Sequence, residues 1–457
     1  MERLKRSILC SGASPHQNPG GGHMNKIGLR KEEKPFETRV PLVPQHVAIL
    51  NKQHNISFIV EPSSQRAFRS EEYDSKSVEI SSIKDSDANV VLGIKEMPVD
   101  FFEPSKVYIF FSHTVKGQKY NMPMLHRIIE VGATLLDYEK IVDSNGRRLI
   151  YFGNWAGLAG MSDTLRVLGQ RLDYEGISPN PFSGIRPTLQ IMHLSGLKEE
   201  IRLLGERIGR LGLPQALSPL VIGFAGYGNV SRGAQEIFDI LPHETVTPHE
   251  LSELPKRADV IYKCVFKEED MVCPTDPQST FELQDYYLHG TAKYQGQFEK
   301  YIPYLTVLLN CIYWTQKYPH LVTKKFVKEH WKSPERRLRV IGDISCDIEG
   351  AIEFTLMSTK PDNPAFCYSI QEDKMELGIA GDGPIVMAVD NLPCELPRES
   401  SLSFSTSLLD FIPSLARADF NMSFEGLALP KELLDAIIVY RGKLTTKYEY
   451  LQEYLST

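Results

Sequence analysis

The chain has 457 residues, of which 42% are hydrophobic and 24% charged, and its formal net charge is −7. This composition is typical of globular proteins with two or three domains. The negative net charge and the lack of a Lys/Arg-rich block argue against nucleic acid as the main partner. No apolar run in the sequence reaches the roughly 18 residues that a membrane-spanning helix needs, so no membrane association is expected.

The first 24 residues carry several basic residues and a glycine run, and we interpret them as a disordered tag or short targeting segment. The seven cysteines are scattered, and none forms a C-x-x-C pair. Their spacing predicts reduced thiols in a reducing compartment, either the cytoplasm or the mitochondrial matrix. We expect neither a disulfide framework nor a metal site.

Residues 25–195 alternate between runs typical of strands and of helices. Helices are expected at Pro44–Lys52 and Met122–Val131. Near-continuous apolar runs are typical of parallel strands that are covered on both faces. Strands are expected at Asn25–Leu29, Ile56–Val60, Asn89–Ile94, Lys106–Phe111, Thr134–Asp137 and Leu149–Phe152.

A second α/β domain is expected over residues 196–394, entered through a long helix at Leu189–Leu211. The polar stretch Phe266–Tyr301 is interpreted as an insertion over a sheet edge and is a candidate lid. Residues 395–457 are expected to return as helices, ending in Lys447–Tyr454, to the first domain. The fold class is therefore α/β, with two Rossmann-like domains, parallel sheets and a cleft between them. Strands of the second domain are expected at Val221–Ala225, Ala258–Tyr262, Leu305–Asn310 and Arg339–Asp343.

The segment Val221–Gln235 begins as an apolar strand, passes through Gly226 and Gly228, and continues as a helix-compatible run. This order is typical of a dinucleotide-binding turn, in which the helix N-terminus receives the pyrophosphate. Ser231 stands where a third glycine is usual. A plain strand-to-helix connection is the alternative interpretation.

Lys95 and His113 each follow a predicted parallel strand, so both are expected at the carboxyl edge of one sheet, where ligands of such folds bind. A lysine and a histidine placed together there form a candidate proton-transfer pair. A surface lysine and a capping histidine are an equally good interpretation.

Other charged and polar side chains are expected at the same strand ends. Glu96 and Glu139 are candidates to tune the lysine, although exposed glutamates are common. Arginine suits carboxylate substrates, and for Arg147 alone we favour a solvated turn. The candidate arginines are Arg30, Arg39, Arg147 and Arg148, and the candidate cofactor contacts are Asn310, Asp343 and Asp390.

Several of these motifs, in this order, resemble lysine–2-oxoglutarate reductase, the reductase half of the bifunctional aminoadipic semialdehyde synthase of animals and plants. The resemblance runs from about residue 26 to 455. More distantly, the chain resembles fungal lysine-forming saccharopine dehydrogenase and alanine dehydrogenase. The motifs are Gly93–Lys95, Phe110–Thr114, Trp155–Met161, Gly228–Phe238, Asp343–Asp347 and Asp390–Pro393.

The resemblance implies that lysine and 2-oxoglutarate condense to an imine, which NADPH reduces to saccharopine, with NAD(H) as the alternative cofactor. It implies Lys95 and His113 as the acid/base pair. It further implies substrate contacts at Arg30, Glu96, Glu139 and Arg148, and cofactor contacts at Gly226, Gly228, Asn229, Val230 and Ser231. A homo-oligomer, or a covalent or functional partnership with saccharopine dehydrogenase, is also expected.

Two departures from the family bear on the cofactor. Tyr227 stands between two glycines where the family often has threonine, and no acid closes the predicted second strand, Glu244–Pro248. The missing acid permits NADP. The rival hypotheses are an alanine-dehydrogenase-like enzyme, an NAD-dependent lysine-forming enzyme, and a cofactor-binding protein without turnover.

Overall fold

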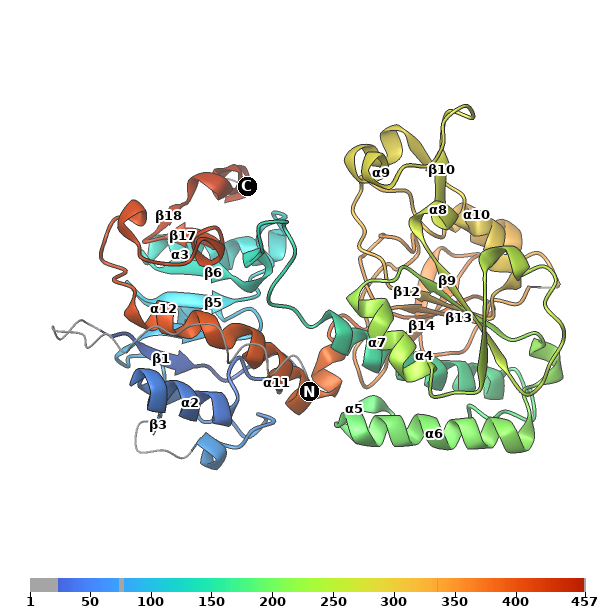
Figure 1. Ribbon diagram of the computed structural model, residues 1–457, viewed down its shortest axis with the longest axis horizontal. Coiled ribbons are helices and arrows are strands. Elements are labelled where there is room, and N and C mark those ends of the chain that lie inside the picture. The colour runs from blue at the N-terminus through green and yellow to red at the C-terminus, as the bar shows by residue number, and fades with distance from the viewer. Residues whose placement is uncertain (1–23, 74–77, 335, 456–457) are drawn as a thin grey trace, which may run out of the picture.

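The computed structural model describes residues 24–73, 78–334 and 336–455, which form two lobes, each built around an eight-stranded sheet (Figure 1). The predicted tag or targeting segment lies, except for Met24, outside the described residues. Both sheets are mostly parallel, which confirms the predicted α/β class with two Rossmann-like domains. The six described cysteines are all free thiols.

In the first lobe, the apolar runs of the sequence form the middle of a sheet that helices cover on both faces. Its strands are parallel except for β17 and β18, which add an antiparallel edge beside β6. In order across the sheet, the strands are β18 (Lys443–Leu444), β17 (Ile437–Tyr440), β6 (Thr134–Asp137), β5 (Val107–Phe110), β4 (Ala88–Leu92), β1 (Lys26–Leu29), β2 (Phe58–Val60) and β3 (Val78–Ile80).

In the second lobe, six neighbouring strands are parallel and two antiparallel strands extend one edge. The strand that directly adjoins β7 is β9, and β8 is the edge strand beyond it. In order, the strands are β15 (Lys374–Leu377), β14 (Ala365–Ser369), β16 (Ile385–Met387), β13 (Val340–Asp343), β12 (Val307–Asn310), β7 (Val221–Ala225), β9 (Ile261–Phe266) and β8 (His243–Val246). A separate hairpin joins β10 (Val272–Pro274) to β11 (Tyr294–Gly296).

The helices around the two sheets are short apart from two. The main ones are α2 (Pro44–His54), α3 (Met122–Glu130), α4 (Gly153–Tyr174), α5 (Thr188–Ile191), α6 (Leu194–Leu211), α7 (Asn229–Phe238), α8 (Glu268–Met271), α9 (Leu283–His289), α10 (Lys324–His330), α11 (Pro397–Leu408), α12 (Ile412–Arg417), α13 (Lys431–Leu434) and α14 (Gln452–Leu455).

The chain passes between the lobes just before α4 and again just before α11 (Figure 1). The buried face of α4 packs in the core of the second lobe, through residues such as Leu158 and Leu165. Residues 25–195 were expected to form the first domain, but within this range α4 and α5 pack with the second sheet. The returning residues Phe404 and Leu408 of α11 lie in the first lobe's core.

Some predicted elements are wrong in detail. Leu149–Phe152 is a bend that leads into α4, because Ile150 is buried as a single anchor and Phe152 is the N-cap of that helix. The long helix predicted at Leu189–Leu211 is divided into α5 and α6 by Met192, which adopts a left-handed φ of 61°. The C-terminal segment contains β17 and a 3₁₀ helix as well as α-helix.

Candidate active site

Lys95 and His113 lie at the carboxyl edge of the first sheet, as predicted. Lys95 follows β4 and His113 follows β5, and these two strands are parallel neighbours. The backbone N–H of Phe111 donates to the carbonyl of Ile94 (3.1 Å), which keeps the two strand ends together beyond the sheet. The structure therefore brings both predicted acid/base residues to one edge.

His113 is held by Glu96. Nδ1 of His113 lies 2.5 Å from Oε1 of Glu96, and the two side chains are 30% and 23% exposed. Burial would raise the pKa of Glu96, but the hydrogen bond and charge of His113 lower it to about 2. His113 itself adopts a φ of +48°, a left-handed backbone conformation that is rare outside glycine and that costs energy. The backbone thus aims the imidazole at Glu96 and at the space beyond it.

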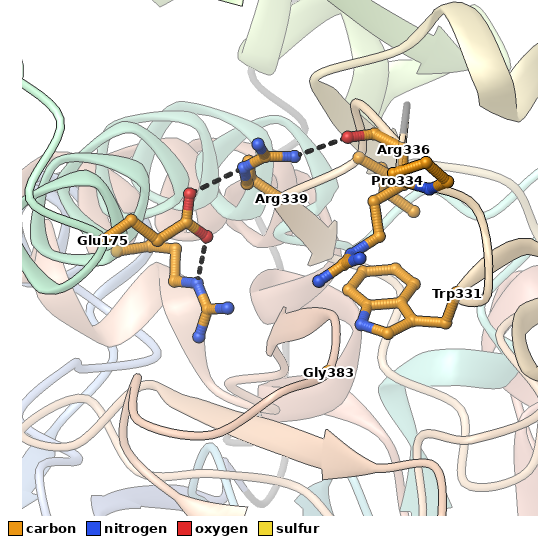
Figure 2. Close-up of a pocket in the computed structure, with 8 residues that line it drawn as sticks. Glu175, Trp331, Pro334, Arg336, Arg339 and Gly383 are labelled. Atoms are coloured by element: carbon orange, nitrogen blue, oxygen red, sulfur yellow. Dashed lines mark hydrogen bonds and ion pairs between the residues drawn. The ribbon is translucent and has the colours of Figure 1, made fainter. Parts of the chain in front are cut away.

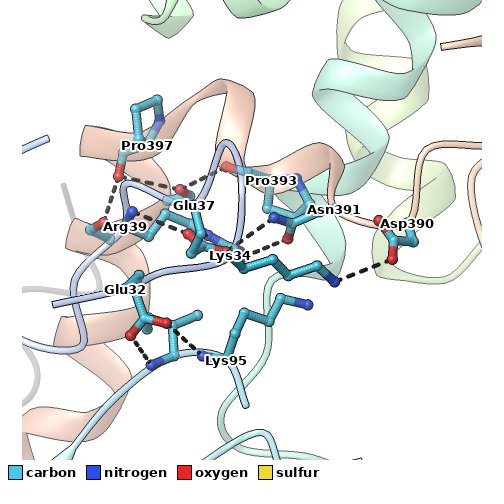
Figure 3. Close-up of polar contacts among 12 residues, drawn as sticks. Glu32, Lys34, Glu37, Arg39, Lys95, Asp390, Asn391, Pro393 and Pro397 are labelled. Carbon is cyan, nitrogen blue, oxygen red and sulfur yellow. Dashed lines mark hydrogen bonds and ion pairs between the residues drawn. The ribbon is translucent and has the colours of Figure 1, made fainter. Parts of the chain in front are cut away.

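Lys95 is half-buried among both basic and acidic side chains (Figure 3). The buried carboxylate of Glu32 accepts hydrogen bonds from the backbone N–H of Ile94 (2.6 Å) and of Lys95 (3.0 Å), which fixes the turn that carries the lysine. Burial lowers the pKa of the Lys95 ammonium, and the charges of Arg39 and Lys34 lower it further. A lysine in this setting more readily exists as the neutral amine, as a proton acceptor must.

The loop after β1 supplies the candidate Arg39 together with two charged residues that were not predicted, Lys34 and Glu37. Arg39 donates to both carboxylate oxygens of Glu37, at 2.7 and 2.5 Å, and both side chains are buried. Asn391 accepts from Arg39 (2.7 Å) and donates to Glu37 (3.1 Å), and Lys34 pairs with Asp390 (3.3 Å; Figure 3). The signal for Lys34 and Glu37 was their place in the loop that follows β1, a strand that adjoins β4.

Asp390, predicted to contact the cofactor, is here the partner of Lys34 at the boundary of the two lobes. Arg30, predicted to bind substrate, is directed into the fold: its side chain is 1% exposed, bonds Glu33 (2.8 Å) and lies 4.8 Å from the Phe101 ring. Its Nε and Nη1 have no hydrogen-bond partner among the described residues. Any contact of Arg30 with a substrate would therefore need an opening of its surroundings.

Arg148 and Glu139 form an ion pair at the same sheet edge, with Arg148 46% exposed. Arg147, by contrast, points to solvent and pairs with Asp143. Burial raises the pKa of Asp347 in the second lobe, the charge of Lys116 opposes this, and the charge of Glu139 adds to it.

The glycine turn of the second lobe has the geometry of a phosphate site. Gly226 has a φ of +90°, and Gly228 is the N-cap of α7. A Cβ on Gly228 would meet no atom within 4 Å, so the space in front of it is open. Asn229 is exposed at the first position of the helix. Free backbone N–H groups at such a helix start favour an anion.

Val230 and Ser231 are placed differently from the other predicted cofactor residues. Val230 packs toward α4, since a Cβ on Gly153 would lie 3.5 Å from its Cγ2. Ser231 is fully buried, and its Oγ accepts from Nε2 of Gln235 (2.9 Å). Their side chains therefore serve the packing of α7, and only their backbone remains available to a ligand.

Asn310 and Asp343 end the adjacent strands β12 and β13 and are buried. Nδ2 of Asn310 donates to Asp343 (2.8 Å), whose other oxygen accepts from Thr355 (2.6 Å). Burial raises the pKa of Asp343 to about 6. Asn310 and Asp343 therefore hold the ends of β12 and β13 in place, and the hydrogen bonds of the Asp343 carboxylate are made within the protein.

A cavity of about 230 Å³ at the opposite edge of the second sheet does not belong to this site (Figure 2). It lies at Arg339, which precedes β13, and so at the amino ends of the parallel strands. The Glu175 carboxylate accepts hydrogen bonds from Arg171 (2.6 Å) and Arg339 (2.8 Å), so the charged groups that line this cavity pair with one another.

Within the described ranges, no group of three or more His, Cys, Asp or Glu side chains is arranged to hold a metal ion. Among the described residues, there is also no helix that is both long enough and apolar enough to cross a membrane.

Similarity to known proteins extends over most of the chain. Residues 28–159 match the family model of the alanine dehydrogenase/PNT N-terminal domain. The chain is 39% identical to alpha-aminoadipic semialdehyde synthase of Arabidopsis thaliana, covering 91% of this chain and 40% of that protein. It is 34% identical to the mitochondrial alpha-aminoadipic semialdehyde synthase of Bos taurus, covering 99% and 50%.

Two further similarities are more distant. Saccharopine dehydrogenase [NAD(+), L-lysine-forming] of Emericella nidulans is 29% identical, covering 86% of this chain and 91% of that protein. An L-alanine dehydrogenase structure superimposes with a TM-score of 0.58 at 16% identity, covering 94% and 99%, which shows a shared fold. The predicted resemblance is confirmed, and the chain spans half or less of the length of the semialdehyde synthases.

Proposed function

We propose that this chain condenses L-lysine with 2-oxoglutarate and reduces the resulting imine to saccharopine with a nicotinamide cofactor. The observation that carries the proposal is the placement of Lys95 and the His113–Glu96 pair together at a charged edge of the first sheet. Similarity to the semialdehyde synthases, over most of this chain, supports the choice of substrates.

In this proposal, Lys95 accepts a proton from the incoming ammonium of lysine, since its own pKa is lowered by burial and by Arg39 and Lys34. The freed amine attacks the keto carbon of 2-oxoglutarate. His113, oriented by Glu96, donates a proton to the hydroxyl that leaves as water when the imine forms.

The substrate carboxylates need cations at the sheet edge. Arg148 and Lys34 are partly exposed, at 46% and 35%, and their ion pairs with Glu139 and Asp390 can be exchanged for a ligand carboxylate. Arg39 stays bound to Glu37 and positions the loop. Arg30 remains a proposed substrate contact on the family resemblance and on its two unpartnered nitrogens.

The cofactor fits the second lobe. Gly226, Gly228 and Asn229 would hold the pyrophosphate with backbone N–H groups at the start of α7. When bound, the reduced nicotinamide supplies a hydride to the imine carbon. The family resemblance favours NADPH, with NADH as the alternative. A mitochondrial location and a working partnership with a saccharopine-oxidising enzyme are further parts of the proposal, in line with the names of the relatives.

The test is oxidation of NADPH, followed by absorbance, with lysine and 2-oxoglutarate present and with each omitted in turn. We expect oxidation only when both are present, and saccharopine as the product by mass spectrometry. Oxidation with a small keto acid and ammonia would support an alanine-dehydrogenase-like enzyme instead. Cofactor binding without oxidation under any of these conditions would contradict an enzymatic role.

A further inference from the structure

The loop after β5 carries His113 and closes into a tight turn directly after it. The backbone N–H of Gly117 donates to the carbonyl of Thr114 at 2.9 Å. His113 has a left-handed φ of +48°, a conformation that costs energy and persists only where neighbouring contacts fix the backbone. The contacts on either side of His113 therefore decide how its imidazole is presented.

Buried residues of the first lobe hold the chain before His113. The backbone N–H of Ser112 donates to the carboxylate of Asp137, at the end of the neighbouring strand β6, at 3.0 Å. Nδ2 of Asn121 donates to the carbonyl of Ser112 (3.0 Å) and to that of His113 (3.2 Å). Because Asp137 and Asn121 are both buried, this side of the loop is fixed from the interior of the lobe.

A segment from the far end of the chain holds the turn after His113. The hydroxyl of Tyr450 donates to the carbonyl of Val115 at 2.6 Å, across 335 positions of sequence. A Cβ on Gly117 would lie 2.6 Å from Cγ of the Tyr454 ring and closer still to Cδ1 and Cε1, so this ring covers the glycine directly. Both Val115 and Gly117 are therefore in contact with the C-terminal segment.

The C-terminal segment is itself anchored in the first lobe. Tyr450 belongs to the 3₁₀ helix Thr446–Leu451, and Tyr454 belongs to α14, which packs on α3. Tyr448 and Leu451 of this segment are buried in the core of the lobe. Tyr450 and Tyr454, by contrast, are 46% and 41% exposed. Substitutions of these two tyrosines should therefore disturb the loop more than the core.

We propose that Tyr450 and Tyr454 are positioning residues for His113, and that they keep the turn Thr114–Gly117 and the imidazole before it in the orientation that proton transfer needs. The inference rests on the proposed role of His113 as the proton donor. Loss of the hold on the turn would let the strained backbone at His113 relax. Because proton transfer depends steeply on alignment, even a small displacement of the imidazole would slow the reaction.

Tyr450→Phe is the first test, because it removes the hydrogen bond to Val115 and keeps the ring. We expect kcat for saccharopine formation to fall by about threefold or more, with the KM for each substrate and the Tm nearly unchanged. A double variant, Tyr450→Phe with Tyr454→Ala, should lose about tenfold or more.

Tyr174→Phe is the matched control. The hydroxyl of Tyr174 also bonds the backbone, since it accepts from the N–H of Gly381 at 3.4 Å, but it does so in the second lobe. This variant should keep the kcat of the wild type. A kcat equal to that of the wild type in the double variant, or a loss of kcat matched by a fall in Tm, would overturn the inference.

Two further measurements do not depend on turnover. Hydrogen exchange of the backbone amides of residues 112–121 should be faster in Tyr450→Phe than in the wild type and in Tyr174→Phe. The ring resonance of His113, identified by its absence in His113→Gln, should also move in Tyr450→Phe. Unchanged exchange together with an unmoved resonance would overturn the inference. If the wild type formed no saccharopine, the proposed function would fail, while faster exchange and a moved resonance would still support the hold of the tyrosines on His113.

Discussion

Asn391 accepts a hydrogen bond of 2.7 Å from Nη2 of Arg39, a residue 352 positions earlier in the chain. The same amide donates to Glu37 (3.1 Å), so one side chain binds both members of a buried ion pair. Asn391 belongs to the segment that returns from the second sheet to the first lobe, and Arg39 to the loop beside Lys95. The bond therefore joins the passage between the lobes to the candidate active site.

Replacing Glu37 by glutamine should destabilise the protein by about 3–5 kcal/mol near pH 7, because Arg39 would remain buried without its carboxylate. Burial would raise the pKa of Glu37, but the charge and hydrogen bonds of Arg39 lower it below the ordinary value of 4.5. The stabilising contribution is therefore fully present above the unfolded-state pKa and is lost as the pH falls through the lower folded-state pKa.

Urea unfolding of the wild type and Glu37→Gln, near neutral pH and again below the ordinary carboxyl pKa, would check this. The difference between the two proteins should be large near neutrality and shrink in acid. Glu130→Gln is the control, because Glu130 forms an exposed pair with Arg127 and should leave stability nearly unchanged. A difference that grows in acid would contradict the assigned pKa direction.

Lys95→Met should lower kcat by at least about tenfold with the fold intact, because it removes the group proposed to accept the substrate proton. The measurement is saccharopine formation, accompanied by thermal unfolding. Lys84→Met, which changes an exposed lysine in the turn before β4, should leave both unchanged. Full activity in a Lys95→Met, His113→Gln double variant would exclude the acid/base assignment.

His113→Gln should also lower kcat by at least about tenfold, since glutamine cannot donate a proton to the leaving hydroxyl. The strained φ of +48° and the bond to Glu96 indicate that the backbone is shaped to present this imidazole. His126→Gln, on the exposed face of α3, is the matched control. Equal activities of these two variants would show that His113 has no chemical role.

The positions of Lys95 and His113 could be predicted because each follows a short buried run whose strand character is unambiguous. The helix α4 was missed, because four glycines and the absence of a polar face disguise it. Its buried glycines are required by close contacts that local sequence does not reveal: Gly157 lies against α7, Gly160 against Ile344 and Gly169 against Phe182.

The order of the strands around β7 could not be predicted for a different reason. Which strand lies next to β7 is decided by packing across the whole sheet, and the sequence offered the next strand along the chain, β8, as the natural neighbour. The burial of Arg30 likewise depends on Phe101 and on other distant residues. The neighbour of β7 and the burial of Arg30 are therefore set by tertiary contacts that the local sequence does not show.

Arg148→Ala should raise the KM for 2-oxoglutarate by about tenfold or more and leave the KM for the nicotinamide cofactor nearly unchanged. The reason is that Arg148 lies at the edge of the first sheet, whereas the phosphate turn lies in the second lobe. Arg147→Ala is the matched control, since its neighbouring guanidinium is 76% exposed and pairs with Asp143. Equal rises for both ligands in Arg148→Ala would indicate a general disturbance of the fold.

Gly157→Ala should weaken both the fold and the cofactor site. A Cβ at Gly157 of α4 would lie 1.9 Å from the carbonyl oxygen of Val230 and 2.6 Å from the nitrogen of Ala234, both backbone atoms of α7. Because these atoms cannot move without separating the two helices, we expect a loss of about 1–3 kcal/mol or more in unfolding free energy. The start of α7 would shift as well, so dinucleotide affinity should fall.

Gly209→Ala provides the opposite case within the same protein. Gly209 is exposed on α6, and a Cβ there would meet no atom within 4 Å. Because alanine favours a helix over glycine, this variant should be more stable by about 0.5–1 kcal/mol and bind the cofactor as the wild type does. If Gly157→Ala matched Gly209→Ala in stability and affinity, the close crossing of α4 and α7 would not be what holds the phosphate turn in place.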